Sequence, residues 1–102
     1  METKAKIPSD LLKALNYSDV EEAALDMIFL SARSRLSEFS QEVEHFEERY
    51  GVDFDAFQKM VTSRVNEEDF EQDEDLMAWK FAKEAAEYWQ GKIEELELAT
   101  RS

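Results

Sequence analysis

Residues 18–50 read SDVEEAALDMIFLSARSRLSEFSQEVEHFEERY, a stretch that contains neither glycine nor proline. Apolar residues recur in it at alternating intervals of four and three, at Leu25, Phe29, Ala32, Leu36, Phe39, Val43, Phe46 and Tyr50. Such spacing aligns them on one side of an α-helix, as in the seam of a coiled coil. Ser18 and Glu21 match a capping box, so we predict one helix from about residue 19 to residue 50.

A second long helix is predicted near the C-terminus. Its apolar residues again recur at threes and fours, at Leu76, Trp79, Ala82, Ala86, Trp89, Ile93 and Leu96. Asp73 or Asp75 is the expected N-cap, because acids in the first turn complement the positive end of the helix dipole. This helix is predicted to run from residue 75 to about residue 98.

A short helix is expected between the two long ones. Gly51 is suited to end the first helix, because glycine adopts the left-handed conformation there without strain. Asp53 can cap the helix that follows. The apolar side of this short helix would consist of Phe54, Phe57, Met60 and Val61.

Residues 1–17 are expected to form a separate N-terminal arm. Pro8 disfavours a helical conformation at Ile7, and Ser9 is then the expected cap of a short helix over residues 10–15. The remaining residues, 18–102, are predicted to form one helical hairpin domain.

The predicted fold class is all-α: a long antiparallel helical hairpin with a short connecting helix. Two glycines and one proline in 102 residues argue against a many-stranded β fold. The first half of the long helix should be buried on more sides than the second, because further apolar residues widen its face: Val20, Ala23, Ala24, Met27, Ile28 and Leu30. Two helices alone cannot bury faces this wide, so we predict a homodimer that forms a four-helix bundle.

The charge of the chain limits its partners. A formal net charge of −13 repels nucleic acid and anionic membranes and attracts basic proteins or cations. No apolar run approaches the roughly 20 residues that cross a bilayer, and the absence of cysteine excludes disulfides and thiolate metal sites. A cytoplasmic protein is expected. One basic feature leaves an alternative open, since Lys4 and Lys6 before Ile7 are spaced like the DNA-contacting strand of a ribbon-helix-helix protein.

No catalytic, metal or cofactor site is predicted. His45 is the single histidine, and it lies among glutamates on a solvated helix face. Glu42 and His45 form the Glu-x-x-His step of carboxylate-bridged di-iron bundles, but both flank the apolar seam. The alternating acids from Asp69 to Asp75 lack the glycine and the glutamate that an EF-hand needs at its sixth and twelfth positions.

The most acidic stretch is the predicted partner-binding site. Seven acids occur within residues 67–75, and Phe70 stands alone among them. The carboxylates would attract a basic protein, while Phe70 either folds back onto the hairpin or anchors the partner. The predicted contact residues are Glu67, Glu68, Asp69, Phe70, Glu71, Asp73 and Asp75.

The aromatic residues of the predicted helix 75–98 allow two interpretations. Phe81, Tyr88 and the two tryptophans could form an exposed recognition stripe together with Phe70, because aromatic residues dominate binding hot spots. At helical spacing, however, such residues are more often part of a core. We expect Trp79 and Trp89 in the core.

Residues 46–57 read FEERYGVDFDAF, and residues 75–79 read DLMAW. These stretches resemble a group of small, mostly uncharacterised archaeal and bacterial proteins with a YG-x-x-F-x-x-F … D-x-x-x-W motif, some of which are labelled as antitoxins of toxin–antitoxin pairs. The resemblance extends over about residues 43–98, and residues 7–12 are similar to the openings of several antitoxin types. It implies that the two motif phenylalanines are core residues, that Trp79 locks the last helix, and that the chain neutralises a toxin.

Three functions are consistent with these observations. The first is an acidic, antitoxin-like protein-interaction module that covers a basic partner such as a toxin ribonuclease. The alternative is a self-associating structural protein without a catalytic role, whose acidity serves solubility. The third is a carboxylate di-metal protein assembled across a dimer.

Overall fold

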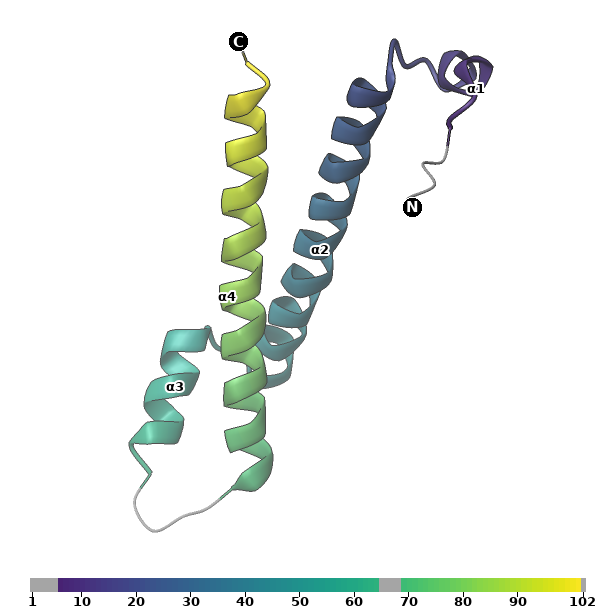
Figure 1. The fold of residues 1–102 in the computed structure, drawn as a ribbon. Helices are drawn as coiled ribbons and strands as arrows, with labels where there is room; N and C mark the ends of the chain where they lie inside the picture. The colour runs from purple at the N-terminus through teal and green to yellow at the C-terminus, as the bar shows by residue number, and fades with distance from the viewer. Residues whose placement is uncertain (1–5, 65–68, 102) are drawn as a thin grey trace, which may run out of the picture. The chain divides into compact units, whose positions relative to one another are not determined.

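The computed structural model describes residues 6–64 and 69–101, and these residues form four helices (Figure 1). The helices are α1 (Ser9–Ala14), α2 (Val20–Tyr50), α3 (Phe54–Thr62) and α4 (Phe70–Ala99). No strand occurs within the described ranges, which confirms the all-α class. The chain divides into two compact units, Met1–Ser31 and Ala32–Ser102. The predicted domain boundary after residue 17 stays a prediction.

The first unit contains α1 and the beginning of α2. Pro8, not Ser9, occupies the N-cap of α1, and no side chain caps this end. Asn16 adopts a left-handed conformation (φ 65°) after α1. The N–H groups of Tyr17 and Asn16 donate to the carbonyls of Leu12 (2.8 Å) and Lys13 (3.0 Å), the pattern of a Schellman motif.

Side chains cap the start of α2, but the cap is Asp19 and not the predicted Ser18. Asp19 accepts a hydrogen bond from the N–H of Glu22 (2.8 Å), and the Glu22 carboxylate accepts one from the N–H of Ser18 (3.1 Å). Aspartate is as good a cap as serine. Glu22 stands at the third helical position, but its carboxylate accepts the N–H of the residue before the cap, so the arrangement differs from a capping box by one residue. The hydroxyl of Tyr17 donates a hydrogen bond to the carboxylate of Asp26, and this bond connects the turn before α2 to the helix.

The apolar residues that widen the face of α2 in its first turns are not buried within the chain. Val20, Met27, Ile28 and Leu30 are each at least half exposed. The prediction that the first half of this helix is buried on more sides than the second is therefore wrong for the single chain. The physical reason is a lack of covering surface, since α1, the other helix of this unit, is six residues long and has no buried residue.

The second unit is the helical hairpin. The later part of α2 and α4 run antiparallel, and α3 packs beside α4 (Figure 1). Gly51 turns the chain after α2 with φ 68°, and the Asp53 carboxylate accepts the N–H of Ala56 (2.9 Å) to cap α3. These features confirm the predicted helix stop and the predicted cap.

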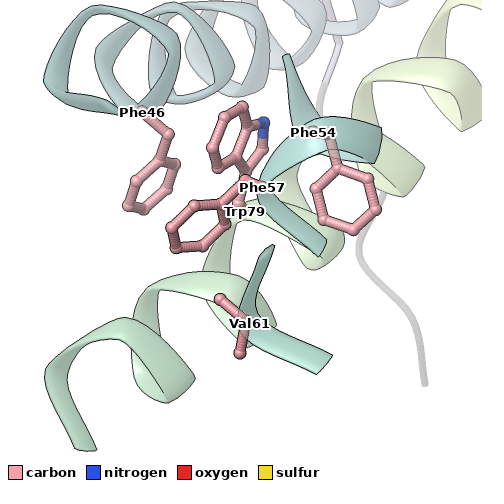
Figure 2. Packing of buried hydrophobic residues seen from close by; sticks show 5 residues of the cluster. All are labelled: Phe46, Phe54, Phe57, Val61 and Trp79. Carbon is pink, nitrogen blue, oxygen red and sulfur yellow. The ribbon is translucent and has the colours of Figure 1, made fainter. Parts of the chain in front are cut away.

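An aromatic core holds the three helices of this unit together. Trp79 of α4 is fully buried (0% exposed), and Phe46 of α2 stacks on it with ring centroids 5.6 Å apart. Phe54 and Phe57 of α3 contact the same indole at 5.7 Å and 5.3 Å (Figure 2). Val61 completes the cluster of buried residues. The expected core positions of Trp79 and of the motif phenylalanines are confirmed.

Both predicted seams face inward. The seam residues of the second unit are all buried or partly buried: Ala32, Leu36, Phe39, Val43, Phe46 and Tyr50 on α2, and Leu76, Trp79, Ala82, Ala86, Trp89, Ile93 and Leu96 on α4. The hairpin of two long helices is therefore confirmed.

The start of α4 differs from the prediction. The helix begins at Phe70 and is capped by Asp69, whose carboxylate accepts the N–H of Gln72 (3.2 Å). The acids expected to precede the helix therefore lie within its first turns, where Glu71 and Asp73 complement the helix dipole.

Candidate protein-interaction surface

Most carboxylates of the predicted binding stretch bind other parts of their own unit. Glu67 and Glu68 lie outside the described residues. Asp69 is occupied as the cap of α4. Glu71 and Asp75 both contact Arg49 of α2, with 3.3 Å between the Arg49 Nη1 and the Asp75 Oδ2.

Asp75 has a second partner in α2. The hydroxyl of Tyr50 donates a hydrogen bond to its carboxylate. Burial and this hydrogen bond together raise the pKa of Tyr50 to about 12. Asp75 is itself only partly exposed, with 16% of its side chain accessible. The Tyr50–Asp75 pair therefore fixes the first turns of α4 against the end of α2.

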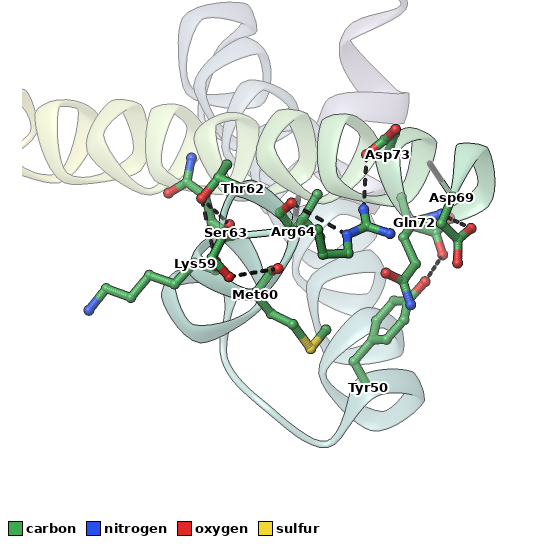
Figure 3. A network of polar contacts seen from close by, with 12 residues as sticks. Tyr50, Lys59, Met60, Thr62, Ser63, Arg64, Asp69, Gln72 and Asp73 are labelled. Atoms are coloured by element: carbon green, nitrogen blue, oxygen red, sulfur yellow. Dashed lines mark hydrogen bonds and ion pairs between the residues drawn. The ribbon is translucent and has the colours of Figure 1, made fainter. Parts of the chain in front are cut away.

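Asp73 links α4 to the region that follows α3. Arg64 Nη2 lies 3.2 Å from Asp73 Oδ1, and Arg64 Nε donates to the carbonyl of Val61 at 3.4 Å (Figure 3). Arg64 is mostly buried, with 16% of its side chain exposed. The acids at 69, 71, 73 and 75 thus hold the start of α4 in place.

Phe70 is the exception in this stretch, because it does not fold back onto the hairpin. It is 73% exposed, and four further large apolar residues of α4 are more than half exposed: Met77 (74%), Phe81 (62%), Tyr88 (55%) and, near the end of the helix, Leu98 (68%). The intervals of seven, four and seven residues from Phe70 to Tyr88 keep Phe70, Met77, Phe81 and Tyr88 on one line along the helix. These residues, Phe70, Met77, Phe81 and Tyr88, are named the α4 stripe.

Neighbouring residues support the aromatic members of the α4 stripe. Phe81 makes an edge contact with Phe39 of α2 at 5.7 Å between ring centroids. Tyr88 makes one with Trp89 at 5.2 Å, and the ammonium of Lys92 lies 5.5 Å from the centre of the Tyr88 ring. Phe81 and Tyr88 are therefore held by packing, although both remain more than half exposed.

Carboxylates border the α4 stripe. Glu74 and Glu84 are exposed and form no ion pair with another described residue. Glu87 and Glu95 are also exposed, in pairs with Lys83 (3.1 Å) and Lys92 (2.9 Å) respectively. Exposed pairs of this kind contribute little to stability, so their charges stay accessible to a partner.

The α4 stripe was only partly foreseen from the sequence. The sequence allows a recognition stripe of Phe70, Phe81, Tyr88, Trp79 and Trp89, but in the structure Trp79 is buried and Trp89 is partly buried. Met77 was missed. The signal that identifies it is the seven-residue interval to Phe70 on the side of α4 opposite Trp79.

Other kinds of site find little support in the part of the chain that the structure describes. No three side chains among its histidine and acidic residues lie close enough to hold a metal ion. His45 is exposed, and its ring contacts Phe46 at 5.6 Å. A hollow of 290 Å³ is lined by Glu94, Glu97, Leu98 and Arg101, all near the end of α4. None of the described helices is long and apolar enough to span a membrane.

Comparison with known proteins adds no family to this picture. No protein-family model matches the chain, and neither a curated protein nor a solved structure matches it.

Proposed function

We propose that this protein is an acidic protein-interaction module that binds a basic partner protein through the α4 stripe, with the cytoplasm as its proposed location. The observation that carries the proposal is the line formed by Phe70, Met77, Phe81 and Tyr88, each more than half exposed. An exposed line of large apolar residues among carboxylates is typical of a surface that is covered in a complex.

The position of the α4 stripe indicates that its residues bind a partner and do not belong to the core of the hairpin. The opposite side of α4 already fills the hairpin core through Trp79, Ala82 and Ile93, which are all buried. Aromatic and methionine side chains are enriched at the centres of protein interfaces. The helix thus has one apolar side for its own fold and a second for a partner.

Charge indicates what kind of partner fits. The chain has a net charge of −13, and Glu74 and Glu84 border the α4 stripe without an ion pair to another described residue. A partner with an apolar groove and a rim of lysine or arginine would gain from both features. A basic toxin of a toxin–antitoxin pair, as the sequence resemblance implies, is one protein of this chemistry.

The predicted acidic site keeps a role in this proposal, but an indirect one. Glu71, Asp73 and Asp75 hold the first turns of α4 through Arg49, Arg64 and Tyr50. By fixing these turns they orient Phe70, the first residue of the α4 stripe. Contacts of Glu67 and Glu68 with the partner remain part of the proposal.

Self-association is the second element of the proposed function. None of the residues described in the range 6–31 is buried, although many are apolar. A second copy of the chain would cover part of this surface, in keeping with the predicted homodimer. The exposed apolar side of early α2 is the observation that favours it over a monomer.

Capture from a native extract tests partner binding. The variant Met77→Lys introduces a positive charge into the α4 stripe, which would repel a basic partner. Met60→Lys is the matched control on α3, where Met60 is 45% exposed. We expect the wild type and Met60→Lys to retain the same basic protein, and Met77→Lys to lose at least tenfold in affinity for it.

Salt provides the second arm of this test. An interface rimmed by opposite charges should weaken between low and high ionic strength. Equal capture by Met77→Lys and Met60→Lys would contradict binding through the α4 stripe. Capture that is insensitive to salt would contradict a basic partner.

A further inference from the structure

The α4 stripe is part of a longer regular series on α4. Glu74 and Glu84 fill its two gaps of seven residues, so that from residue 70 to residue 88 the series recurs at intervals of four, three, four, three and four. All six residues are exposed. These intervals place them on one side of the helix over about 27 Å, as in the seam of a coiled coil. They are named the outer seam of α4: Phe70, Glu74, Met77, Phe81, Glu84 and Tyr88.

The residue types of the outer seam of α4 follow the order apolar, acidic, apolar, apolar, acidic, apolar. Neither Glu74 nor Glu84 forms an ion pair with another described residue. A helix packed along the outer seam would take both carboxylates out of water, which is unfavourable unless a group of opposite charge pairs with them. The facing helix therefore needs apolar residues at four positions and lysine or arginine at two.

A second copy of α4 does not meet this requirement. A parallel pair that aligns the apolar residues sets Glu74 against Glu74 and Glu84 against Glu84. In an antiparallel pair centred on residue 79, Glu74 faces Glu84, because both lie five residues from the centre. Like charges meet in both arrangements, which disfavours self-association through this side of the helix.

The helix that carries the outer seam of α4 is held in place before a partner arrives. Trp79, which is 0% exposed, fixes the opposite side of α4 in the core, and Arg49 and Arg64 bind carboxylates of its first turns. The ring of Phe81 lies against that of Phe39 with 5.7 Å between centroids. A surface organised in advance loses little conformational entropy on binding, which favours recognition by a single helix.

We propose that the partner binds the outer seam of α4 through a basic amphipathic helix, whose lysine or arginine residues pair with Glu74 and Glu84. Two basic residues of that helix lie ten positions apart, as the two glutamates do, and apolar residues occupy its other seam positions. The order of residue types is the same from either end of the outer seam, so such a helix pairs with both glutamates in either orientation. This inference rests on the proposed function and specifies the part of the partner that contacts the α4 stripe.

A synthetic helical peptide tests this charge pattern against the full-length protein. The probe peptide has leucine at the four apolar seam positions, lysine at the two positions that face Glu74 and Glu84, and alanine and glutamine elsewhere. The control peptide has the same composition, but its two lysines are exchanged with glutamines on its opposite side. In fluorescence anisotropy, the wild type should bind the probe peptide at least tenfold more tightly than the control peptide. Equal affinity for the two peptides, or no binding of either, would overturn the inference.

Charge reversal on the protein tests whether these two glutamates are responsible. The seam variant, Glu74→Lys/Glu84→Lys, should lose the preference for the probe peptide and should prefer a peptide with glutamate at the two lysine positions. The control variant, Glu87→Lys/Glu94→Lys, changes the net charge equally at exposed residues outside the outer seam and should keep the wild-type preference. A control variant that loses the preference as fully as the seam variant would overturn the inference, because net charge alone would then explain the binding.

Capture from native extract separates this inference from the proposed function. We expect Met77→Lys and the seam variant to lose the basic partner and the control variant to retain it. If Met77→Lys loses the partner and the seam variant retains it, the α4 stripe binds the partner in another way and the inference alone fails. If Met77→Lys retains the partner, the proposed function fails with it.

Discussion

Trp79 is surrounded by four aromatic rings, those of Phe46, Tyr50, Phe54 and Phe57. Helical spacing predicted that Trp79 faces inward, because it lies in the apolar series of its helix. Spacing could not predict that its indole Nε1 is buried and has no hydrogen-bond partner among the residues that the structure describes. That outcome depends on which rings from α2 and α3 reach the indole, and those contacts are tertiary.

Substitutions at Trp79 should reveal both properties. Trp79→Ala empties the centre of the core and should lower the free energy of unfolding by about 3–5 kcal/mol. Trp79→Phe keeps an aromatic ring in the core and removes the unpartnered N–H, whose burial is itself unfavourable. It should therefore lower the free energy of unfolding by less than about 2 kcal/mol. Denaturant unfolding of the two variants measures the difference. A phenylalanine variant as unstable as the alanine variant would contradict this account of the indole.

Tyr50 makes stability depend on alkaline pH. Its pKa is raised to about 12 by burial and by its hydrogen bond to Asp75, while the unfolded chain releases this proton near pH 10. The folded protein therefore keeps the neutral phenol longer than the unfolded chain does. The resulting stabilisation is complete below pH 10 and is lost as the pH rises through about 12.

Tyr50→Phe isolates this contribution from other groups that titrate in the same range. Between pH 10 and pH 12, the free energy of unfolding should fall more steeply for the wild type than for Tyr50→Phe. Denaturant titrations at several pH values provide both slopes. Parallel slopes would show that the Tyr50–Asp75 pair does not control this titration.

At the scale of elements, the helices were more predictable than their ends. The predicted end of α2, the cap of α3 and both inward seams are confirmed, because they depend on local residue types and on spacing. The start of α4 was placed several residues too late. Several acids in a row could each act as the cap, and the structure places Asp69 in this role. Glu71 and Asp73 then lie inside the helix and pair with Arg49 and Arg64, contacts that the sequence does not show.

The two glycines should respond in opposite ways to alanine. Gly51 has φ 68° and nothing within 4 Å of an added Cβ, so Gly51→Ala should cost about 1 kcal/mol through backbone strain alone. Gly91 lies inside α4, also with nothing within 4 Å, and Gly91→Ala should stabilise by up to about 1 kcal/mol. Thermal unfolding of both variants compares them directly. A shift of the same sign in both would contradict the assigned helix end.

At the scale of the whole molecule, the sequence predicted the fold class better than it predicted which surface residues are available to a partner. Net charge suggested that the acidic stretch itself meets the partner, yet Asp69, Glu71, Asp73 and Asp75 all have partners within their own unit. A carboxylate in a sequence does not reveal whether it pairs internally. The α4 stripe became visible only once the inward side of α4 was assigned, because the remaining apolar residues then had no place in the core.

The most direct test of binding through the α4 stripe is a methionine-oxidation footprint, read by mass spectrometry in the purified protein and in native extract. Met77 is 74% exposed on the α4 stripe, and Met60, 45% exposed on α3, is the internal control. We predict that both residues oxidise readily in the purified protein and that extract slows the oxidation of Met77 alone. Oxidation of Met77 in extract as fast as in the purified protein, relative to Met60, would contradict the proposal.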